Sequence, residues 1–483
     1  MPKFLNNRLL SICRKEKEKQ HYGDVIVVEG LLQEQYFTLN IVSSQNSSKF
    51  DANFLEDVKN DDKFNAKFLD DVIKESRDNI DDVIKDSRDN IAIISKNIDN
   101  IDLNKNITFY EVKKNEEVLS FTNDFQPENY KPCYNVHIFY YPWYGNPAVD
   151  GDFVHWNHKY LPHWSPEVAK MYPNGKHVPP LDIGSNFYPE LGAYSSADIK
   201  VIDNHMQQIL MGNIGVLAVS YYPPGLYDDN GKDWQFILPK IFNVAAKYKL
   251  KVTFHIEPYK DRSEVTLKQD IEHILRVYGS HPAFYKHKHK GVLRPLLYVY
   301  DSYHTKPENW KQLLGTNSTL SIRDTANDCF VIGLLVGQNH KQDIISSGFD
   351  GFYTYFAANG FTYGSSRYNW KSLKSFADEN DLLYIPSIGP GYIDTRVRPW
   401  NAENTRKRLK GKYYIDSWNA ALNVKPDLIS ITSFNEWHEG TQIEKAIPKE
   451  TTNFKYLDYS PSPPDFYLSL TNKYVQTFSK CSI

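Results

Sequence analysis

The chain has 483 residues, which is long enough for two or three average domains or for one large barrel with an appendage. Its formal net charge of −3 excludes the strongly basic surface that nucleic acids or anionic membranes attract. Aromatic residues make up 14% of the chain, which is typical either of a large aromatic core or of flat faces that hold sugar rings.

Targeting signals and cysteine motifs are absent from the sequence as written. No apolar run reaches the about 18–20 residues needed to span a bilayer, and the basic first thirty residues lack the hydrophobic core of a signal peptide. We therefore expect no membrane or secretory segment. We also expect neither a disulfide framework nor a zinc ribbon, because no CxxC pair occurs among the four cysteines, Cys13, Cys133, Cys329 and Cys481.

Residues 1–125 differ from the rest because they are rich in Asp, Asn and Lys and contain an 11-residue repeat. Asp70–Ile80 reads DDVIKESRDNI and Asp81–Ile91 reads DDVIKDSRDNI. Such a period fits a helix of about 3.67 residues per turn. We expect a helical or partly disordered stem or spacer without catalytic chemistry, with a short oligomerising coil as the alternative. The catalytic domain is then expected over residues 126–483.

From about Cys133, short apolar segments alternate with helical patterns. Helical spacing of apolar residues is found over Ser196–Gly212, Glu264–Tyr278, Asn369–Asn380 and Thr405–Leu422. This alternation predicts an α/β fold, a (β/α)8 TIM-type barrel; a doubly wound open sheet is the alternative, but no GxGxxG follows the first strand. The eight expected strands are Val136–Trp143, Ile214–Tyr222, Lys251–Pro258, Pro295–Asp301, Cys329–Val336, Phe349–Phe356, Leu382–Ile388 and Leu428–Phe434.

A barrel of this kind carries its chemistry at the C-terminal ends of the strands and in the loops that follow them. Tyr355 is a further candidate to line the pocket, but strand alternation directs about half of the tyrosines at these ends into the barrel wall instead. Glu257 is expected to bind sugar hydroxyl groups, and the alternative is that it only forms an ion pair with Arg262 or Lys260. The expected substrate-binding residues at these ends are Tyr141, Trp143, Tyr222, His255, Glu257, Tyr353, Asn435 and Trp437.

Glu436 and Glu439 are the candidate catalytic residues, because they directly follow the last expected strand. If this segment is helical, positions i and i+3 lie on one face, roughly 5–6 Å apart at Cβ. Glycosidic cleavage needs such a pair, one carboxyl group to protonate the leaving oxygen and another to attack or to act as a base. Two solvated surface acids are the alternative.

The sequence favours no metal and no cofactor. His438 and Glu439 begin an HExxH pattern, but Gln442 occupies the position of the second zinc ligand. The loop residues His155, His158 and His163 have ligand-like spacing, yet histidines in an aromatic loop more often make hydrogen bonds. Serine-hydrolase, P-loop and dinucleotide motifs are absent.

Five segments between about residues 130 and 475 together resemble the glycoprotein endo-α-1,2-mannosidases of glycoside hydrolase family 99. In chain order they are YYPWYGNP, HIEPYKDR, DGFYTYFAANGFTYGSS, GPGYIDTRVRPWN and SFNEWHEGTQIEKA. The resemblance implies cleavage of the α-1,2 bond in a glucosylated high-mannose N-glycan of a glycoprotein, release of a glucosyl-mannose disaccharide, and retention of configuration. It implies no metal, no nucleic acid and no protein partner. It also implies Golgi residence, usually through an N-terminal membrane helix, which the sequence as written lacks.

By the same resemblance, Glu436 deprotonates the 2-hydroxyl of the sugar, which attacks C1 to give an anhydro sugar. Glu439 then protonates the leaving oxygen and afterwards activates water. This role needs a raised pKa for Glu439. Two other functions stay open: a catalytically silent sugar-binding barrel, and a related hydrolase of α-mannan or α-glucan that differs in the loops after the first two strands.

Overall fold

The computed structural model describes residues 13–16, 25–32, 35–42, 125–228 and 230–481, and the chain divides into two units, Met1–Phe121 and Thr122–Ile483. The first unit contains an antiparallel sheet that the sequence did not predict. The repeat over residues 70–91 lies outside the described residues, so its helical character remains a prediction. The sheet pairs its strands in the order β1 (Cys13–Glu16), β2 (Val25–Leu32) and β3 (Gln35–Val42).

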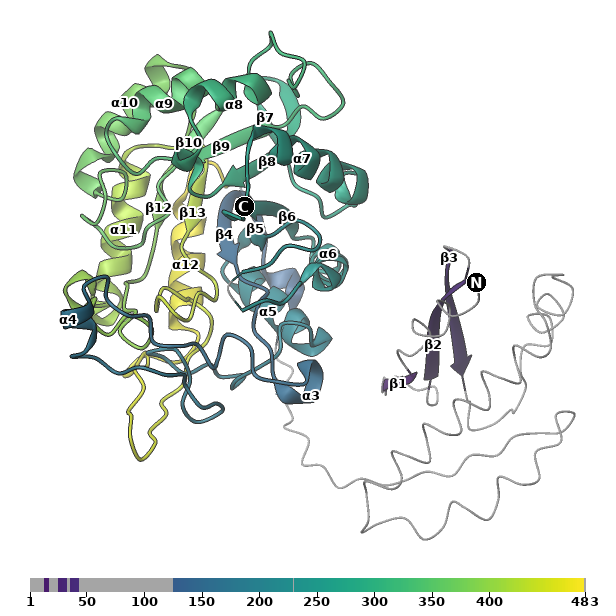
Figure 1. Ribbon diagram of the computed structural model, residues 1–483, viewed down its shortest axis with the longest axis vertical. Helices are drawn as coiled ribbons and strands as arrows, with labels where there is room; N and C mark the ends of the chain where they lie inside the picture. Colours follow the sequence, from purple (N-terminus) through teal and green to yellow (C-terminus); the bar gives the residue numbers. More distant parts are fainter. Residues whose placement is uncertain (1–12, 17–24, 33–34, 43–124, 229, 482–483) are drawn as a thin grey trace, which may run out of the picture. The chain divides into compact units, whose positions relative to one another are not determined.

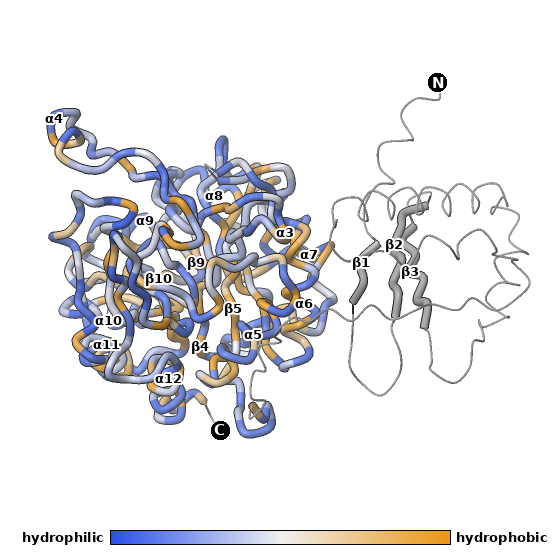
Figure 2. Tube along the Cα trace, turned by 90° about the horizontal axis from the view of Figure 1, so that it is seen from below, coloured by the Kyte–Doolittle hydropathy of each residue, from blue (hydrophilic) through white to orange (hydrophobic). Residues whose placement is uncertain are grey.

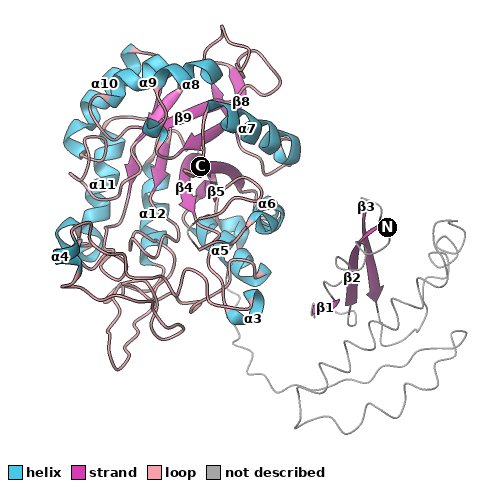
Figure 3. Ribbon diagram, viewed as in Figure 1, coloured by secondary structure: helices cyan, strands magenta, loops and turns pink. Residues whose placement is uncertain are grey.

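The second unit is a barrel of parallel strands surrounded by helices (Figure 3), which confirms the predicted fold class. β13 pairs with β4 on one side and with β12 on the other, and the two ends of the sheet, β11 and β12, are consecutive pieces of the chain, so the ring is nearly closed. An antiparallel hairpin strand, β7 (Lys286–His289), adds to β8. The barrel strands are β4 (Cys133–Tyr140), β5 (Ile214–Tyr221), β6 (Lys251–Ile256), β8 (Val292–Val299), β9 (Phe330–Leu334), β10 (Gly351–Tyr353), β11 (Leu383–Ile385), β12 (Ser387–Ile388) and β13 (Ile429–Ile431).

The seventh predicted strand is present as two pieces, β11 and β12, on either side of Pro386. Proline has no backbone N–H to donate to the ladder. Ser387 bridges the break. Its side-chain Oγ accepts the backbone N–H of Tyr355 at 2.7 Å, and its backbone N–H donates to Oγ1 of Thr354 at 3.0 Å. The two pieces therefore act as one barrel strand.

A helix follows every barrel strand, and these helices form the outer layer (Figure 1). Four correspond to predicted helices: α5 (Ile199–Met211), α7 (Glu264–Tyr278), α10 (Trp370–Glu379) and α11 (Lys412–Asn423). The other four are α6 (Leu238–Lys247), α8 (Pro307–Leu314), α9 (His340–Ser347) and α12 (Phe466–Thr477). Two single-turn helices, α3 (Pro147–Asp150) and α4 (Pro166–Ala169), lie in the long loop after β4.

Local sequence explains where the helices begin. Ser263 caps α7, and its side chain and that of Thr266 each accept a hydrogen bond from the other's backbone N–H. The helix predicted from Thr405 begins only at Lys412, because Leu409 and Lys410 have positive φ angles of 49° and 52°. Of the four unpredicted helices, α8 and α9 have only eight residues each, and α8 begins with Pro307.

Aromatic and histidine rings fill the barrel interior. The ring of Phe139 lies 4.6 Å from His255 and 5.7 Å from Tyr353. His137 pairs with the hydroxyl of Tyr298 at 2.7 Å, which satisfies these buried polar atoms. Much of the high aromatic content therefore belongs to the core.

A disulfide joins Cys133, the first residue of β4, to Cys481 near the end of the chain, with 5.3 Å between the Cα atoms. We did not predict it, since 348 residues separate the two positions and no local motif links them. Cys329 is a free, buried cysteine. No helix within the described ranges is long and apolar enough to cross a membrane.

Candidate active site

Glu436 and Glu439 lie in a turn that directly follows β13. The segment is not helical, so the spacing of i and i+3 on a helix face does not apply: residues 437–440 form a turn. The N–H of Glu436 donates to Oγ of Ser433 at 2.8 Å, and the N–H of Glu439 donates to Oε2 of Glu436 at 3.0 Å. Gly440 has a φ of 60°, and a Cβ there would lie 2.7 Å from the carbonyl oxygen of Ile393. The turn itself therefore holds the two glutamates together.

Both carboxyl groups have raised pKa values. Burial raises the pKa of Glu439 to about 7, and the positive charge of Arg398 opposes this rise. Burial and the charge of Glu439 raise the pKa of Glu436 well above its usual range. A buried pair of like charges retains a proton near neutral pH, and the N–H that Glu436 accepts favours the negative charge on that residue. The pair thus holds a proton and a negative charge side by side near neutral pH.

Arg398 is held beside Glu439 by the loop after β12. The N–H of Ile393 donates to the carbonyl oxygen of Glu439 at 2.8 Å, which ties this loop to the turn. Asp394 is fully buried and accepts hydrogen bonds from Arg398 at 3.2 Å and from Asn401 at 3.0 Å. The guanidinium is therefore oriented by a buried carboxylate, and the Glu439 charge acts to raise its pKa.

Glu257 is a third buried carboxylate at the same end of the barrel. Its Oε1 accepts the Ser220 hydroxyl at 2.8 Å and lies 3.3 Å from Nδ1 of His255. His255 contacts the Tyr353 hydroxyl through Nε2 at 2.7 Å. Arg262 donates instead to the carbonyl oxygens of residues 300 and 301, so it is not the partner that the alternative role of Glu257 required. The charge of Glu257 also contributes to the raised pKa of Glu439.

Tyr141 and Tyr355 are buried, and their hydroxyl groups are hydrogen-bonded to each other. Burial and the charges of Glu257, Glu436 and Glu439 raise the pKa of Tyr141 well above its usual range. Both phenols therefore stay protonated and remain hydrogen-bond donors among three carboxylates.

Two predicted binding residues, Asn435 and Trp437, are fully buried beneath the turn. The Asn435 amide accepts the N–H of Tyr141 at 2.8 Å and donates to its carbonyl at 2.9 Å. Nε1 of Trp437 donates to Glu444 at 3.0 Å and to the Tyr194 hydroxyl at 3.2 Å. In this structure these two side chains therefore form hydrogen bonds that hold the turn in place.

Trp143 and Tyr222 are half-buried and line a pocket together with residues that include Ser220, Asp228 and Trp234. The Trp143 ring stacks on His155 at 4.5 Å. His155 is fixed in turn by Asp228, 2.6 Å from its Nε2. The pocket therefore connects to Glu257 through Ser220.

The histidines of the loop after β4 have partners other than a metal. His155 pairs with Asp228, Nδ1 of His158 lies 2.7 Å from the carbonyl of Lys159, and Nδ1 of His163 accepts the N–H of Ser165 at 3.0 Å. Within the described residues, no group of three or more His, Cys, Asp and Glu side chains is arranged to hold a metal ion.

A family model described as glycosyl hydrolase family 99 matches residues 132–480, which is most of the chain and the whole barrel. The chain belongs to glycosyl hydrolase family 99. It is therefore a glycoside hydrolase, and the resemblance seen in the five segments is confirmed.

Curated relatives of this family 99 enzyme agree with that result. The glycoprotein endo-α-1,2-mannosidase of Rattus norvegicus is 57% identical over 348 residues, which cover 72% of this chain and 75% of the rat protein. The glycoprotein endo-α-1,2-mannosidase-like protein of Homo sapiens is 53% identical over 347 residues, covering 72% and 76%. The family 99 endo-α-mannosidase structure from Bacteroides thetaiotaomicron is 44% identical, has a TM-score of 0.66, and covers 72% of this chain and 98% of that one.

Two residues of this family 99 site were missed by sequence reasoning. Arg398 lies in the segment GPGYIDTRVRPWN but has no local motif of its own. Glu444 is fully buried and contacts Trp437, Tyr194 and, at 3.2 Å, Nε2 of His205 on α5. No sequence motif identifies these two charged residues, and only their contacts in the folded chain place them near the site.

Proposed function

We propose that this enzyme is a retaining, endo-acting glycosidase that cleaves the α-1,2-mannosidic bond of glucosylated high-mannose N-glycans and releases a glucosyl-mannose disaccharide. The observation that carries the proposal is the hydrogen-bonded pair of Glu436 and Glu439, whose raised pKa values give an acid and a base. The names of the curated relatives support the bond and the glycoprotein substrate.

In the first step, the Glu436 carboxylate takes the proton of the mannose 2-hydroxyl, and O2 attacks C1. The bond from C1 to the leaving oxygen breaks, and Glu439 gives its proton to that oxygen. In the second step, Glu439 takes a proton from water, and the water oxygen bonds to C1. The bond between C1 and O2 breaks, and Glu436 returns its proton to O2. Two inversions at C1 give net retention.

The surrounding residues fit this chemistry. The paired phenols of Tyr141 and Tyr355 lie among the carboxylates and supply donors for sugar hydroxyls. Trp143 supplies a half-buried aromatic face, backed by His155. Glu257 and His255 supply acceptors and further polar atoms at the same barrel end.

We also propose that the enzyme acts in the Golgi, as the family resemblance implies. The disulfide between Cys133 and Cys481 supports this, because disulfides persist in oxidising compartments such as the secretory pathway and are rare in the cytosol.

The test uses the purified protein, a glucosylated high-mannose glycan, and mass analysis of the products. We expect a released disaccharide whose initial anomer, read by NMR, is α. Stepwise loss of single hexoses would contradict the endo-acting assignment. Binding without cleavage would indicate a silent sugar-binding barrel, and cleavage of α-mannan or α-glucan alone would indicate the related hydrolase.

A further inference from the structure

The long loop after β4 carries an unusually exposed tryptophan. Trp164 exposes 79% of its surface, although tryptophan is a largely buried residue type. Its ring lies 3.7 Å from the ring of His163 and meets Trp400 edge-on at 5.2 Å. We call these three rings, His163, Trp164 and Trp400, the aromatic ledge. Just after it, α4 projects from the barrel in Figure 2.

The aromatic ledge is held in place by hydrogen bonds on each side. Nε1 of Trp400 donates to the carbonyl of Leu161 at 3.0 Å, and the N–H of Leu161 donates to the carbonyl of Val397 at 2.8 Å. Nδ1 of His163 accepts the N–H of Ser165 at 3.0 Å. Single exposed apolar residues are ordinary on protein surfaces. Trp164 differs because hydrogen bonds fix the two rings that it contacts, His163 and Trp400.

The supporting segment also leads directly to the catalytic pair. Val397 and Trp400 flank Arg398, whose charge acts on the carboxyl group of Glu439. The same loop is tied to the catalytic turn by the hydrogen bond from Ile393 to the Glu439 carbonyl. Glu439 is the group that protonates the leaving oxygen in the proposed mechanism. The segment that supports the aromatic ledge therefore also holds the group that acts on the carboxyl group of Glu439.

We propose that the aromatic ledge is a binding site for a mannose ring of the N-glycan on the leaving-group side of the scissile bond, beyond the sugar that Glu439 protonates. This inference rests on the proposed function. The apolar face of a pyranose ring packs on an open aromatic face, and its hydroxyl groups stay in water at the rim. A shallow, one-sided site of this kind suits a branched sugar chain that remains attached to a protein.

The experiment compares two substrates with the same reacting disaccharide. One is the intact glucosylated high-mannose glycan, and the other is an aryl glycoside of the glucosyl-mannose disaccharide, which has no sugar on the leaving-group side. We expect Trp164→Ala to lower kcat/KM about 10-fold on the glycan, as the loss of an aromatic anchor does. We expect kcat/KM on the aryl glycoside to stay within about 2-fold of the wild type, which also shows that the variant is folded.

Two further variants sharpen the result. Trp164→Phe keeps an aromatic face and is expected to restore most of the lost kcat/KM. Tyr134→Ala removes an aromatic residue that is 38% exposed and lies at the start of β4, at the opposite end of the barrel. We expect this control variant to keep the wild-type kcat/KM on both substrates. Equal losses on both substrates, or no loss on the glycan, would overturn the proposal.

A separate measurement keeps this proposal distinct from the proposed function. If the wild type cleaves neither substrate, the proposed function fails, and calorimetric titration with an unglucosylated high-mannose glycan decides the fate of the aromatic ledge. Weaker binding by Trp164→Ala than by wild type and Tyr134→Ala would support it. Equal binding by all three, or no binding by the wild type, would overturn it.

Discussion

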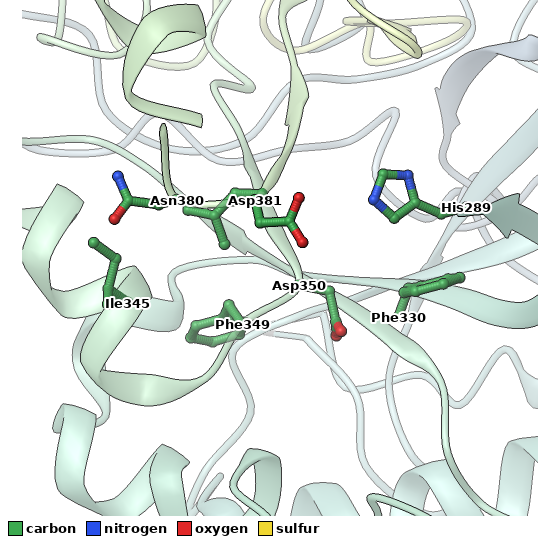
Figure 4. A pocket seen from close by; sticks show the side chains of 8 residues that line it. His289, Phe330, Ile345, Phe349, Asp350, Asn380 and Asp381 are labelled. Atoms are coloured by element: carbon green, nitrogen blue, oxygen red, sulfur yellow. The ribbon is translucent and has the colours of Figure 1, made fainter. Parts of the chain in front are cut away.

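The two ends of the barrel surround their buried carboxylates with different partners. At the C-terminal end, Glu436 and Glu439 adjoin each other and both pKa values are raised. At the N-terminal end, Asp350 precedes β10 and is bound at 2.8 Å both by Arg323 and by the N–H of Val331. Asp350 adjoins the pocket in Figure 4, which the N-terminal ends of β9, β10 and β11 surround.

The difference shows that a buried charge or a pocket alone does not make an active site. Arg323 donates to Asp328, Asp350 and the carbonyl oxygens of Leu314, Cys329 and Gly348, so the N-terminal cluster is compensated. It stabilises the fold, because a buried charge with partners avoids the cost of an isolated one. Burial raises the pKa at both ends, but Arg323 opposes the rise at Asp350, whereas the carboxyl groups of Glu436 and Glu439 adjoin each other.

The largest expected effect is on activity at the C-terminal end. Glu436→Gln and Glu439→Gln each remove an acid–base group, and we expect kcat to fall about 10²–10⁴-fold.

Glu439 also affects stability. Its pKa is higher in the folded than in the unfolded chain, so its ionisation destabilises the fold as pH rises from the unfolded-state pKa through about 7. Thermal stability at pH 8 should therefore be equal or higher in Glu439→Gln. Glu450→Gln, at an exposed ion pair with Lys455, is the control and should change neither quantity. Full activity of both site variants would refute the assignment.

At the N-terminal end we expect a loss of stability rather than of catalysis. Arg323→Gln leaves Asp350 buried without its cation, which costs about 3–5 kcal/mol in the free energy of unfolding. Denaturant unfolding measures this, and kcat per folded molecule should equal that of the wild type. Arg276→Gln on the exposed side of α7 serves as the matched control. A change in kcat of Arg323→Gln without a change in its stability would contradict a purely stabilising role of this cluster.

The disulfide also belongs to the N-terminal end, since Cys133 begins β4. Replacing both Cys133 and Cys481 by serine should lower the free energy of unfolding by about 2–4 kcal/mol, because the unfolded chain loses its cross-link. Catalysis at 25 °C should be unchanged. A reducing agent should destabilise the wild type and leave the double variant unaffected; equal stability of the two proteins under oxidising conditions would contradict the role.

The smallest effect concerns pH. The proposed mechanism needs protonated Glu439, so kcat/KM should fall as pH rises through about 7. Arg398 lowers the pKa of Glu439, so Arg398→Gln should move this alkaline limb to higher pH. Profiles normalised to each maximum measure the shift, with the exposed Lys407→Gln as a control. A limb that moves to lower pH in Arg398→Gln would show that another group controls it.

Local sequence determined the order of the elements and the position of the proposed catalytic pair. Strand and helix periods are short-range, so eight strands were placed correctly, and Glu436 and Glu439 followed from their position after the last strand. Helices α8 and α12 were not predicted, although both bury one face against the barrel, and such packing supplies most of the stability of a helix in a protein.

The tertiary structure alone decided which distant residues meet. It decided that the segment after β13 is a turn and not a helix, since the hydrogen bond from the N–H of Glu439 to the Glu436 carboxylate and the close approach of Ile393 fix that backbone. It also joined Cys133 to Cys481 and placed Arg398 beside Glu439. These contacts follow from closing the barrel, which brings together segments whose separation along the chain leaves no periodic signal in the sequence.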